Sequence, residues 1–370
     1  MRILHTADWH LGIDFHKLSL IEDQHFFMKQ LKEVVLEENI DVVIVAGDVY
    51  DTSLATKEAI ALYDEIMQML CIELKKKVIV IAGNHDSATR LSVLSGLLSG
   101  MGLYVVGSLT EKVKGIEIDD CIFYPIPYFH LEQVRKAYDI DVKTQEEAFA
   151  CICNDILAHA DHSKHLIGIA HTFLADASVC ESDRFANVGG SDLVSSKVFD
   201  GFSYVAMGHL HRRQYAGNHV WYSGSPLPYS FSEANMKKGV LIYDSETDAV
   251  YERDMEPLHH LIVKKGKYEE LKESMKMEAA DEKAYVKIEV EDFPVSFEMM
   301  EYFRQGYPNL LHLSGKILHQ EDSNITIDIK DLETISDIDL VKQFFKDYYN
   351  EELSDTALSL FKEIQEEVGV

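Results

Sequence analysis

Residues 77–87, KVIVIAGNHDS, indicate both the class of fold and the position of a functional site. The apolar run at 78–82 is typical of a strand that is buried on both faces, as in the sheets of α/β proteins. Gly83 allows a sharp turn, and an amide, an imidazole and a carboxylate follow it. Ligands bind such sheets where the strands end. The same residues would also suit an ordinary polar turn, so this stretch does not decide by itself.

The pattern of an apolar strand followed by polar side chains recurs along the first two thirds of the chain. Strands predicted at 2–7 and 40–47 precede Asp8 and His10, and Asp48 and Asp51, respectively. Strands predicted at 165–173 and 202–207 carry His171 or precede His209 and His211. Helices are predicted at 20–38, behind a capping box of Ser19 and Glu22, and at 56–74. The resulting β-α-β-α-β order favours a parallel sheet covered by helices.

The rest of the chain divides at about residue 257. Before it we expect helices at 90–99 and 144–159, strands at 103–106 and 121–126, and a hairpin of 239–243 with 249–253. After it, strands at 258–263, 285–290 and 310–317 and helices at 268–277 and 297–304 predict a small α+β module. Two apolar stripes at 338–348 and 357–368 predict amphipathic helices, which would be part of a core or would dock on a partner helix.

Composition limits the class of protein and its partners. The 370 residues are enough for two domains, and no apolar run reaches the roughly 18 residues of a membrane helix. The start lacks the pattern of a secretory signal, so we expect a cytoplasmic protein. The five cysteines are scattered and read as reduced thiols. A net charge of −28 argues against an unaided grip on nucleic acid, unless metal ions or a separate subunit supply the positive charge.

Eight side chains at the predicted strand ends share the chemistry of metal ligands. They are Asp8, His10, Asp48, Asn84, His85, His171, His209 and His211. Carboxylate, imidazole and amide without thiolate suit divalent ions such as Mn²⁺, Fe²⁺ or Zn²⁺. The set is too large for one ion, and two ions about 3.5–4 Å apart, joined by one carboxylate, would catalyse hydrolysis of a phosphoester.

In this order the motifs Asp8-x-His10, Gly47-Asp48-x-x-Asp51, Gly83-Asn84-His85-Asp86, His171 and Gly208-His209-x-His211 resemble the calcineurin-like metallophosphoesterase family. The resemblance covers roughly residues 1–253. It implies an α/β fold in which a β-sandwich is flanked by helices, with a small α+β capping domain and C-terminal helices. Further stretches, among them 222–233 (YSGSPLPYSFSE), are similar to the nucleases of this family that act in double-strand-break repair and recombination.

The resemblance also implies roles for individual residues. Asp8, His10, Asp48 and His211 would hold a first ion, and Asp48, Asn84, His171 and His209 a second, with Asp48 as the bridge. His85 would face the scissile phosphate, where it stabilises charge or protonates the leaving oxygen. Asp51 would orient His85. Mn²⁺ is the expected metal, although Mg²⁺, Fe²⁺ or Zn²⁺ would also fit.

The nuclease resemblance implies a domain order and partners. Residues 1–255 would form the nuclease domain, 256–332 a DNA-contacting capping domain, and 333–370 a helical tail that binds an ATPase. We expect a coiled-coil ATPase subunit, a homodimer within a heterotetramer, and ATP-dependent cleavage of DNA ends and hairpins. His16, Arg90 and Arg212 would contact DNA phosphates, although solvated surface charge explains them equally well.

Two other functions remain open at the level of the sequence. The same fold serves phosphatases and cyclic-nucleotide phosphodiesterases, but protein phosphatases of the family carry Glu and Arg where this chain has Asp86 and Thr52. A non-enzymatic subunit that tethers an ATPase to DNA would not need all eight strand-end side chains.

Overall fold

The structure, a computed structural model, describes residues 1–175, 177–180, 182–183, 193–277 and 283–315. All of them lie in one compact unit, Met1–Lys316. The expected tail at 333–370, and the end of the expected capping domain, fall outside the described residues.

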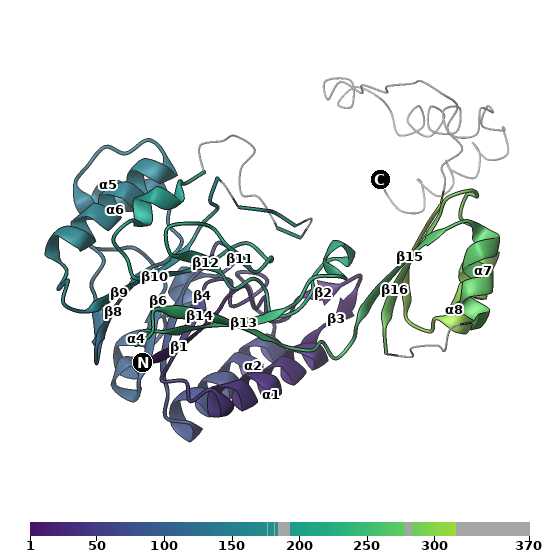
Figure 1. The fold of residues 1–370 in the computed structure, drawn as a ribbon, viewed down its shortest axis with the longest axis horizontal. Coiled ribbons are helices and arrows are strands. Elements are labelled where there is room, and N and C mark those ends of the chain that lie inside the picture. The colour runs from purple at the N-terminus through teal and green to yellow at the C-terminus, as the bar shows by residue number, and fades with distance from the viewer. Residues whose placement is uncertain (176, 181, 184–192, 278–282, 316–370) are drawn as a thin grey trace, which may run out of the picture. The chain divides into compact units, whose positions relative to one another are not determined.

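Two six-stranded sheets form the centre of this unit (Figure 1). In the first sheet, β1, β4, β5 and β6 are parallel and β13 and β14 extend it antiparallel. Its strands in spatial order are β14 (Ala249–Asp254), β13 (Gly239–Asp244), β1 (Arg2–Thr6), β4 (Val42–Ala46), β5 (Lys77–Ile81) and β6 (Leu103–Val106). The predicted β-α-β-α-β alternation is therefore confirmed for this sheet.

The second sheet begins where the sequence pattern suggested a continuation of the first. Its strands in spatial order are β11 (Gln214–Tyr215), β12 (Val220–Tyr222), β10 (Tyr204–Gly208), β9 (His165–His171), β8 (Cys121–Ile126) and β7 (Ile116–Ile118). Strands β8, β9, β10 and β12 are parallel. The single parallel sheet inferred from alternation alone is thus corrected to the β-sandwich that the family resemblance implied.

Alternate side chains of each central strand serve different cores, because both faces are covered. Ile44 and Ile79 of the first sheet and Ile167 of the second belong to one cluster between the sheets. Their neighbours Val43 and Val78 belong to a cluster with α1 (Ile21–Glu37) and α2 (Lys57–Met67). The outer face of the second sheet shares a third cluster with α5 (Leu131–Tyr138) and α6 (Gln145–His159). Helices therefore flank the sandwich on both sides, which explains the unbroken apolar runs of its strands (Figure 1).

Short elements complete the sandwich domain. They are β2 (Asp14–Phe15), β3 (Leu18–Ser19), α3 (Ala88–Leu91), α4 (Ser95–Leu98), the 3-10 helices η2 (Ser99–Met101), η3 (Ser196–Phe199) and η4 (Phe231–Glu233), and the π-helix η1 (Gln68–Glu73). The helix expected at 90–99 is therefore divided into two single turns, and the one expected at 56–74 ends as a π-helix.

The capping box expected at Ser19 and Glu22 is wrong, whereas two other helices have a threonine cap at their N-terminus. Helix α1 has Leu20 at its N-cap and no side-chain cap, because Ser19 is paired with Asp14 in the β2–β3 hairpin. Thr144 accepts a hydrogen bond from the main-chain nitrogen of Glu147 at 3.1 Å and caps α6. Thr56 caps α2 in the same way, through Ala59.

The region after 257 has its own sheet and core. Strands β15 (Leu261–Gly266), β16 (Tyr285–Val290) and β17 (Leu310–Gly315) are parallel and alternate with α7 (Tyr268–Met277) and α8 (Phe297–Gly306). The α+β expectation is therefore corrected to a β-α-β-α-β module. Val286, Ile288 and Phe303 lie in its buried cluster.

Helix α1 connects this module to the sandwich domain. The amide of Gln30 exchanges two hydrogen bonds with the main chain of Glu256, at 2.8 and 3.0 Å. Asp23 accepts from the ring of His259 at 2.9 Å, and that ring stacks on Tyr285. Among the described residues, no helix has the length and apolar character needed to cross a membrane.

Candidate dinuclear metal centre

The predicted ligands meet at the ends of five strands, three from the first sheet and two from the second. Asp8 and His10 follow β1, Asp48 follows β4, and Asn84 follows β5. His171 is the last residue of β9, and His209 and His211 follow β10. The site therefore lies where the two sheets meet, and both sheets contribute predicted ligands to it.

Four of these residues have a backbone conformation that is rare for residues other than glycine. The φ angles of Asp8, His10, Asp48 and His209 are +53°, +41°, +48° and +105°. Such left-handed conformations cost about 1–3 kcal/mol each and persist where the surrounding structure holds them. The hydrogen bonds from the main-chain nitrogens of Asp8 and His10 to the carbonyls of Gly47 and Asp48, both 3.0 Å, hold two of the turns together.

Two glycines of the motifs are required by close contacts between the sheets. Gly47 has a φ of +91°, and a Cβ there would lie 2.3 Å from Nδ1 of His171. A Cβ on Gly208 would lie 1.9 Å from the carbonyl oxygen of Ala46. The Gly-Asp and Gly-His pairs of the sequence thus reflect the close approach of β4 to β9 and β10.

The residues expected at the first ion form one cluster of nitrogen and oxygen atoms. Asp8, His10 and Asp48 each place a ligand atom within 4.8 Å of the other two. Nε2 of His211 lies 3.2 Å from Nε2 of His10, so the two ring nitrogens face each other. Two nitrogen lone pairs that face each other are repulsive unless a proton or a cation lies between them.

The residues expected at the second ion form an adjoining cluster. Asp48, His171 and His209 also place ligand atoms within 4.8 Å of one another, so Asp48 belongs to both groups. Oδ1 of Asn84 lies 2.9 Å from Nε2 of His171 and 3.1 Å from Nδ1 of His209. The structure therefore brings together all seven predicted ligands, and the carboxylate expected to bridge is the one between the two groups.

Burial and mutual charge change the pKa values within the cluster. Burial raises the pKa of Asp8 to about 7, against the opposing effect of His171. Burial lowers the pKa of His171, but the carboxylates of Asp48 and Asp8 and the carbonyl of Ala46 together outweigh it and raise that pKa to about 9. Burial raises the pKa of Asp48, yet the charges of His171 and His10 hold it well below its ordinary value. Without a metal, a proton on His171 therefore compensates the buried carboxylates.

The two histidines after β10 behave differently. Burial, followed by the neighbouring His171, lowers the pKa of His209 to about 3. Burial, followed by His10, lowers the pKa of His211 well below its ordinary value. Both imidazoles are therefore neutral at physiological pH, which is the form that binds a metal ion.

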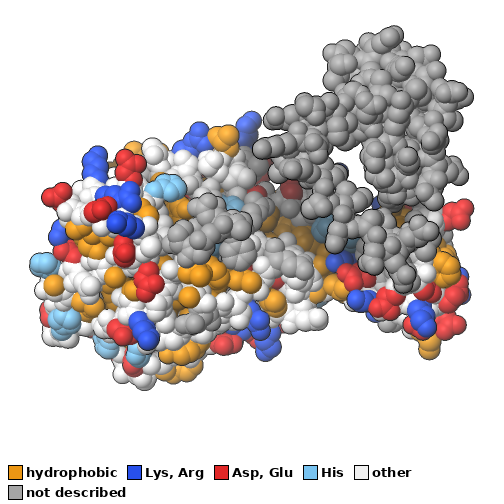
Figure 2. Space-filling model, turned by 90° about the horizontal axis from the view of Figure 1, so that it is seen from above, with side chains coloured by type: hydrophobic (Ala, Val, Ile, Leu, Met, Phe, Trp, Pro, Cys, Tyr) orange, Lys and Arg blue, Asp and Glu red, His pale blue; other side chains and the backbone are white. Residues whose placement is uncertain are grey.

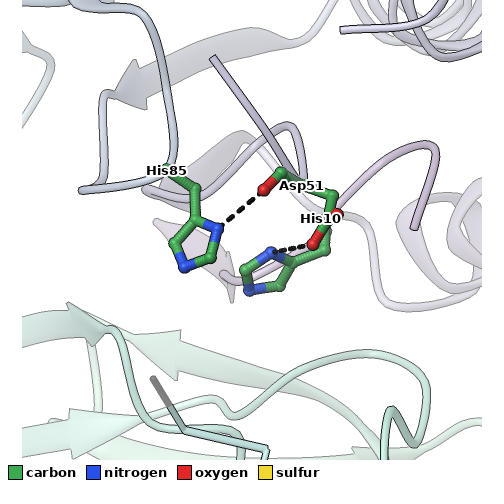
Figure 3. A group of neighbouring side chains, drawn as sticks. All are labelled: His10, Asp51 and His85. Carbon is green, nitrogen blue, oxygen red and sulfur yellow. Dashed lines mark hydrogen bonds and ion pairs between the residues drawn. The ribbon is translucent and has the colours of Figure 1, made fainter. Parts of the chain in front are cut away.

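His85 is partly buried and lines the same cavity as His10, and Asp51 contacts both rings (Figure 3). Nδ1 of His85 donates to the main-chain carbonyl of Asp51 at 2.7 Å. The carboxylate of Asp51 instead lies beside the other ring, with Oδ1 3.6 Å from Nδ1 of His10. The expected contact between Asp51 and His85 thus exists, but the main chain makes it and the carboxylate faces His10.

The pattern of strand ends did not reveal several residues that support the site. Gln24 donates to the carbonyls of Trp9 and His10 and accepts from Gly12, which holds the first ligand loop. The Tyr229 hydroxyl donates to the carbonyl of Trp9 at 2.6 Å. Gln24 lies in the first turn of α1, where no sequence pattern indicates its role. Tyr229 lies in the 222–233 stretch, where only the family resemblance drew attention.

Asp86, in the opening motif, has a structural role. Its carboxylate accepts hydrogen bonds from three main-chain nitrogens, those of Gly83, Val49 and Tyr50, at 2.9, 3.1 and 2.9 Å. It therefore joins the loops after β4 and β5, which carry Asp48 and Asn84.

A groove of about 350 Å³ adjoins the metal cavity, and Ser182 and Tyr229 line both. His16, one of the expected DNA contacts, lines it with Lys287 and His312 of the β15–β17 module. Burial, together with the charges of His312 and Lys287, lowers the pKa of His16. Phe15 and Phe231 line the same groove, with ring centroids 5.0 Å apart.

The other two expected DNA contacts, Arg90 and Arg212, are exposed and line neither cavity. Arg90 donates to the carbonyl of Ser53, in the loop after β4, at 2.8 Å. Both arginines are therefore near the ligand loops without facing into the site.

The donor set fits a pair of divalent ions, since carboxylate, imidazole and amide atoms that are buried or partly buried converge there from two sheets. The family described as Calcineurin-like phosphoesterase matches residues 1–213, more than half of the chain. The chain belongs to this family of metal-dependent phosphoester hydrolases. A second family, described as Type 5 capsule protein repressor C-terminal domain, matches residues 257–349.

The chain is also similar over almost its whole length to a curated protein. It is 31% identical over 369 residues to the SbcD subunit of the nuclease SbcCD from Staphylococcus epidermidis, covering 98% of this chain and 98% of that protein. Two solved structures are more distant. TT1561 of Thermus thermophilus is 10% identical over 68% of this chain and 98% of that chain. GAP50, the anchor in the inner membrane complex of Plasmodium, is 11% identical over 89% of this chain and 99% of that chain. The TM-score is 0.41 for each of the two structures, so neither supports a conclusion about this chain.

Proposed function

We propose that this chain is the nuclease subunit of a complex that repairs and recombines DNA, acting on DNA ends and hairpins with an SbcC-type coiled-coil ATPase. The activities would be an ATP-dependent double-strand exonuclease and a single-strand or hairpin endonuclease. One observation carries the proposal: two adjoining groups of metal-ligand side chains share Asp48 in a chain that resembles a nuclease subunit from end to end.

The expected metal arrangement follows from these contacts. Asp8, His10 and His211 would hold one ion and Asn84, His171 and His209 the other, with Asp48 between them. Two divalent ions, when bound, would activate a water and stabilise the attacking and leaving oxygens of an in-line displacement. Mn²⁺ is our choice, since the mixed nitrogen and oxygen donors suit it, as they would Fe²⁺, Zn²⁺ or, less well, Mg²⁺.

His85 is placed to act on the substrate rather than to bind an ion. Its main-chain nitrogen donates to Oδ1 of Asp48 at 2.9 Å, and its Nδ1 donates to the carbonyl of Asp51. These two bonds fix the ring and leave Nε2 for the cavity that His85 lines. In this position Nε2 would stabilise charge on the scissile phosphate or give a proton to the leaving oxygen.

The groove beside the metal cavity supports a nucleic-acid substrate. His16, Lys287 and His312 provide donors for phosphate oxygens, and Phe15 and Phe231 provide apolar faces against which a sugar or base could pack. Two of the three donors come from the β15–β17 module, so we propose that this module is a capping domain that contacts DNA. Its expected bounds, 256–332, stay a prediction, as does 1–255 for the nuclease domain.

An ATPase partner would explain the strong acidity. On the face of the described residues seen in Figure 2, basic side chains form small separate groups among acidic, apolar and other side chains, without a continuous basic surface. With a net charge of −28, the grip on DNA would come mainly from the partner. The helical tail at 333–370, outside the described residues, is our candidate for the partner's binding segment. A cytoplasmic location stays a prediction.

Exposed apolar side chains support the proposal of a homodimer within a heterotetramer. Val93, Leu94, Leu97 and Met101, on and around α4 and η2, are each more than half exposed. Their clustering in one short segment of a highly charged protein is typical of a contact surface. A second copy of the chain is the occupant we propose, because the resemblance to nucleases of this family implies a homodimer.

The experiment that tests the function is a cleavage assay with Mn²⁺ on linear and hairpin-ended duplex DNA, with and without the ATPase and ATP. The Asp48→Ala variant, purified in parallel, excludes a contaminating nuclease, and a phosphomonoester serves as the alternative substrate. DNA cleavage that the partner and ATP enhance, and that Asp48→Ala loses, is the expected result. Hydrolysis of the phosphomonoester alone would refute the nuclease proposal and favour a phosphatase on the same site.

A further inference from the structure

A chain of hydrogen-bonded polar groups leads from the proposed ligand His211 to the stretch at 222–238. Nδ1 of His211 lies 2.9 Å from Oγ of Ser182, and that hydroxyl lies 2.5 Å from Oε1 of Glu233. The other oxygen of Glu233 pairs with Nζ of Lys238. Glu233 and Lys238 are 1% and 6% exposed, so this is an ion pair within the protein.

The lysine has all of its hydrogen-bonding capacity satisfied. Besides Glu233, Nζ of Lys238 donates to the carbonyl of His211 and to Oγ of Ser225, both at 2.8 Å. An ammonium group has three N–H donors, and three acceptors surround it. Because Lys238 is charged and fully paired, Glu233 is an ionised carboxylate, which accepts hydrogen bonds and donates none.

The direction of each hydrogen bond then follows. The hydroxyl of Ser182 has one proton, and Glu233 can only accept, so Ser182 donates to Glu233. The oxygen of Ser182 must therefore accept from His211, which places a proton on Nδ1. A neutral imidazole carries one proton, so Nε2 is left with a free lone pair. That atom is the one that faces Nε2 of His10 at 3.2 Å.

We propose that Ser182, held by Glu233 and Lys238, is a positioning residue that fixes His211 as the tautomer able to bind a divalent ion through Nε2. The inference rests on the dinuclear site of the proposed function and adds to it a determinant of metal affinity. His171 has an analogous support, since its Nδ1 donates to the carbonyl of Ala46 at 2.9 Å. For His211 the acceptor is the side chain of Ser182 instead of a main-chain carbonyl, so a substitution at Ser182 can remove it.

The test compares Mn²⁺ binding to the full chain as wild type, Ser182→Ala and Ser182→Thr, by calorimetry and by the electron paramagnetic resonance of free Mn²⁺. Loss of such a hydrogen bond behind a ligand typically weakens metal binding about 10–100-fold. We expect Ser182→Ala to weaken the binding of one of the two ions by that factor and to leave the affinity for the other unchanged. Ser182→Thr keeps the hydroxyl and should bind both ions with wild-type affinity. In the metal-free protein, ¹⁵N spectra of labelled histidines should show that the Nδ1–H tautomer of His211 is lost in Ser182→Ala.

Ser245 provides a matched control far from the site. It is 2% exposed, its hydroxyl donates to Asp120 at 2.8 Å, and it accepts from the amino group of Met1 at 3.0 Å. Ser245→Ala should bind both ions as the wild type does. If Ser182→Ala does not fold, Ser182→Cys, whose sulfur is a weak acceptor, should weaken the same ion.

The outcomes separate this inference from the function. Wild-type binding of two ions with unchanged affinities in Ser182→Ala, or in Ser182→Cys if the first variant does not fold, would overturn the role of Ser182 and leave the metal site intact. A wild-type chain that binds no Mn²⁺ would overturn both.

Discussion

The affinity of the second ion should increase steeply with pH, because His171 must lose a proton before it can bind a metal. In the metal-free protein the pKa of His171 is raised to about 9, since Asp48, Asp8 and the carbonyl of Ala46 together outweigh the effect of burial. A raised pKa means that the charged form predominates at pH 7, so metal binding is weakest at low pH and strengthens until the pH passes that pKa. Between pH 7 and pH 8 the neutral fraction rises about ten-fold, which corresponds to about 1.4 kcal/mol of binding free energy.

The assay is calorimetric titration of the full chain with Mn²⁺ at several pH values, in buffers that differ in their heat of ionisation. At pH 7.5 the second ion should release about one proton from His171, seen as a heat that depends on the buffer. His171→Gln removes the titrating group, so its weaker binding should lose this pH dependence. An affinity that stays constant from pH 7 to pH 8, or heats that are the same in every buffer, would refute the reasoning.

Other substitutions separate the roles within the site. Asp48→Ala should lose both ions and all turnover, whereas His85→Gln should keep two ions and lose about 10²–10⁴-fold in kcat on a small chromogenic phosphodiester; loss of the ions in His85→Gln would contradict its assignment. Asp51→Asn should change kcat by less than about ten-fold, because the main-chain carbonyl that holds His85 remains, and a large loss with unchanged metal content would show that the carboxylate acts on the substrate. Deletion from Asp337 onward should leave cleavage of the small phosphodiester intact and abolish association with the ATPase, so co-purification of the truncated chain with its partner would exclude the tail as the binding segment.

The proposed ligands could be predicted from the sequence because the pattern that places them at the strand ends is local. A strand buried on both faces needs an unbroken apolar run, and the residues after it reach the sheet edge whatever the strand order. His171, His209 and Asn84 could therefore be named before the structure showed that they meet. The number of sheets could not be read in the same way, since β5 and β8 have the same apolar texture although they belong to different sheets.

The supporting residues depend on contacts between segments far apart in the chain. Ser182 contacts Glu233 and His211 across 51 and 29 residues, and no periodicity links a loop serine to either. The capping box at Ser19 failed for a similar reason, because pairing with Asp14 fixed the backbone of that serine before the helix began. The direction of a side chain could not be predicted from the sequence either. Asp51 lies beside both His10 and His85, but only the structure reveals that its carboxylate faces His10 and its main-chain carbonyl faces His85.

The proposed ligands come from both sheets, so the proposed activity should depend on the assembly of the sandwich. Asp8, Asp48 and Asn84 come from the sheet of β1, β4 and β5, while His171 and His209 come from the sheet of β9 and β10. If the chain were split between β6 and β7, the first fragment would lack every strand of the second sheet, and each fragment would carry only part of either proposed ligand set. Neither fragment could then hold the ion pair alone. Recovery of activity on mixing would report that β13 and β14 of the second fragment had paired with β1 and that the two sheets had docked. The proposed metal centre therefore reports whether the two sheets are correctly packed, because its side chains converge only at their interface.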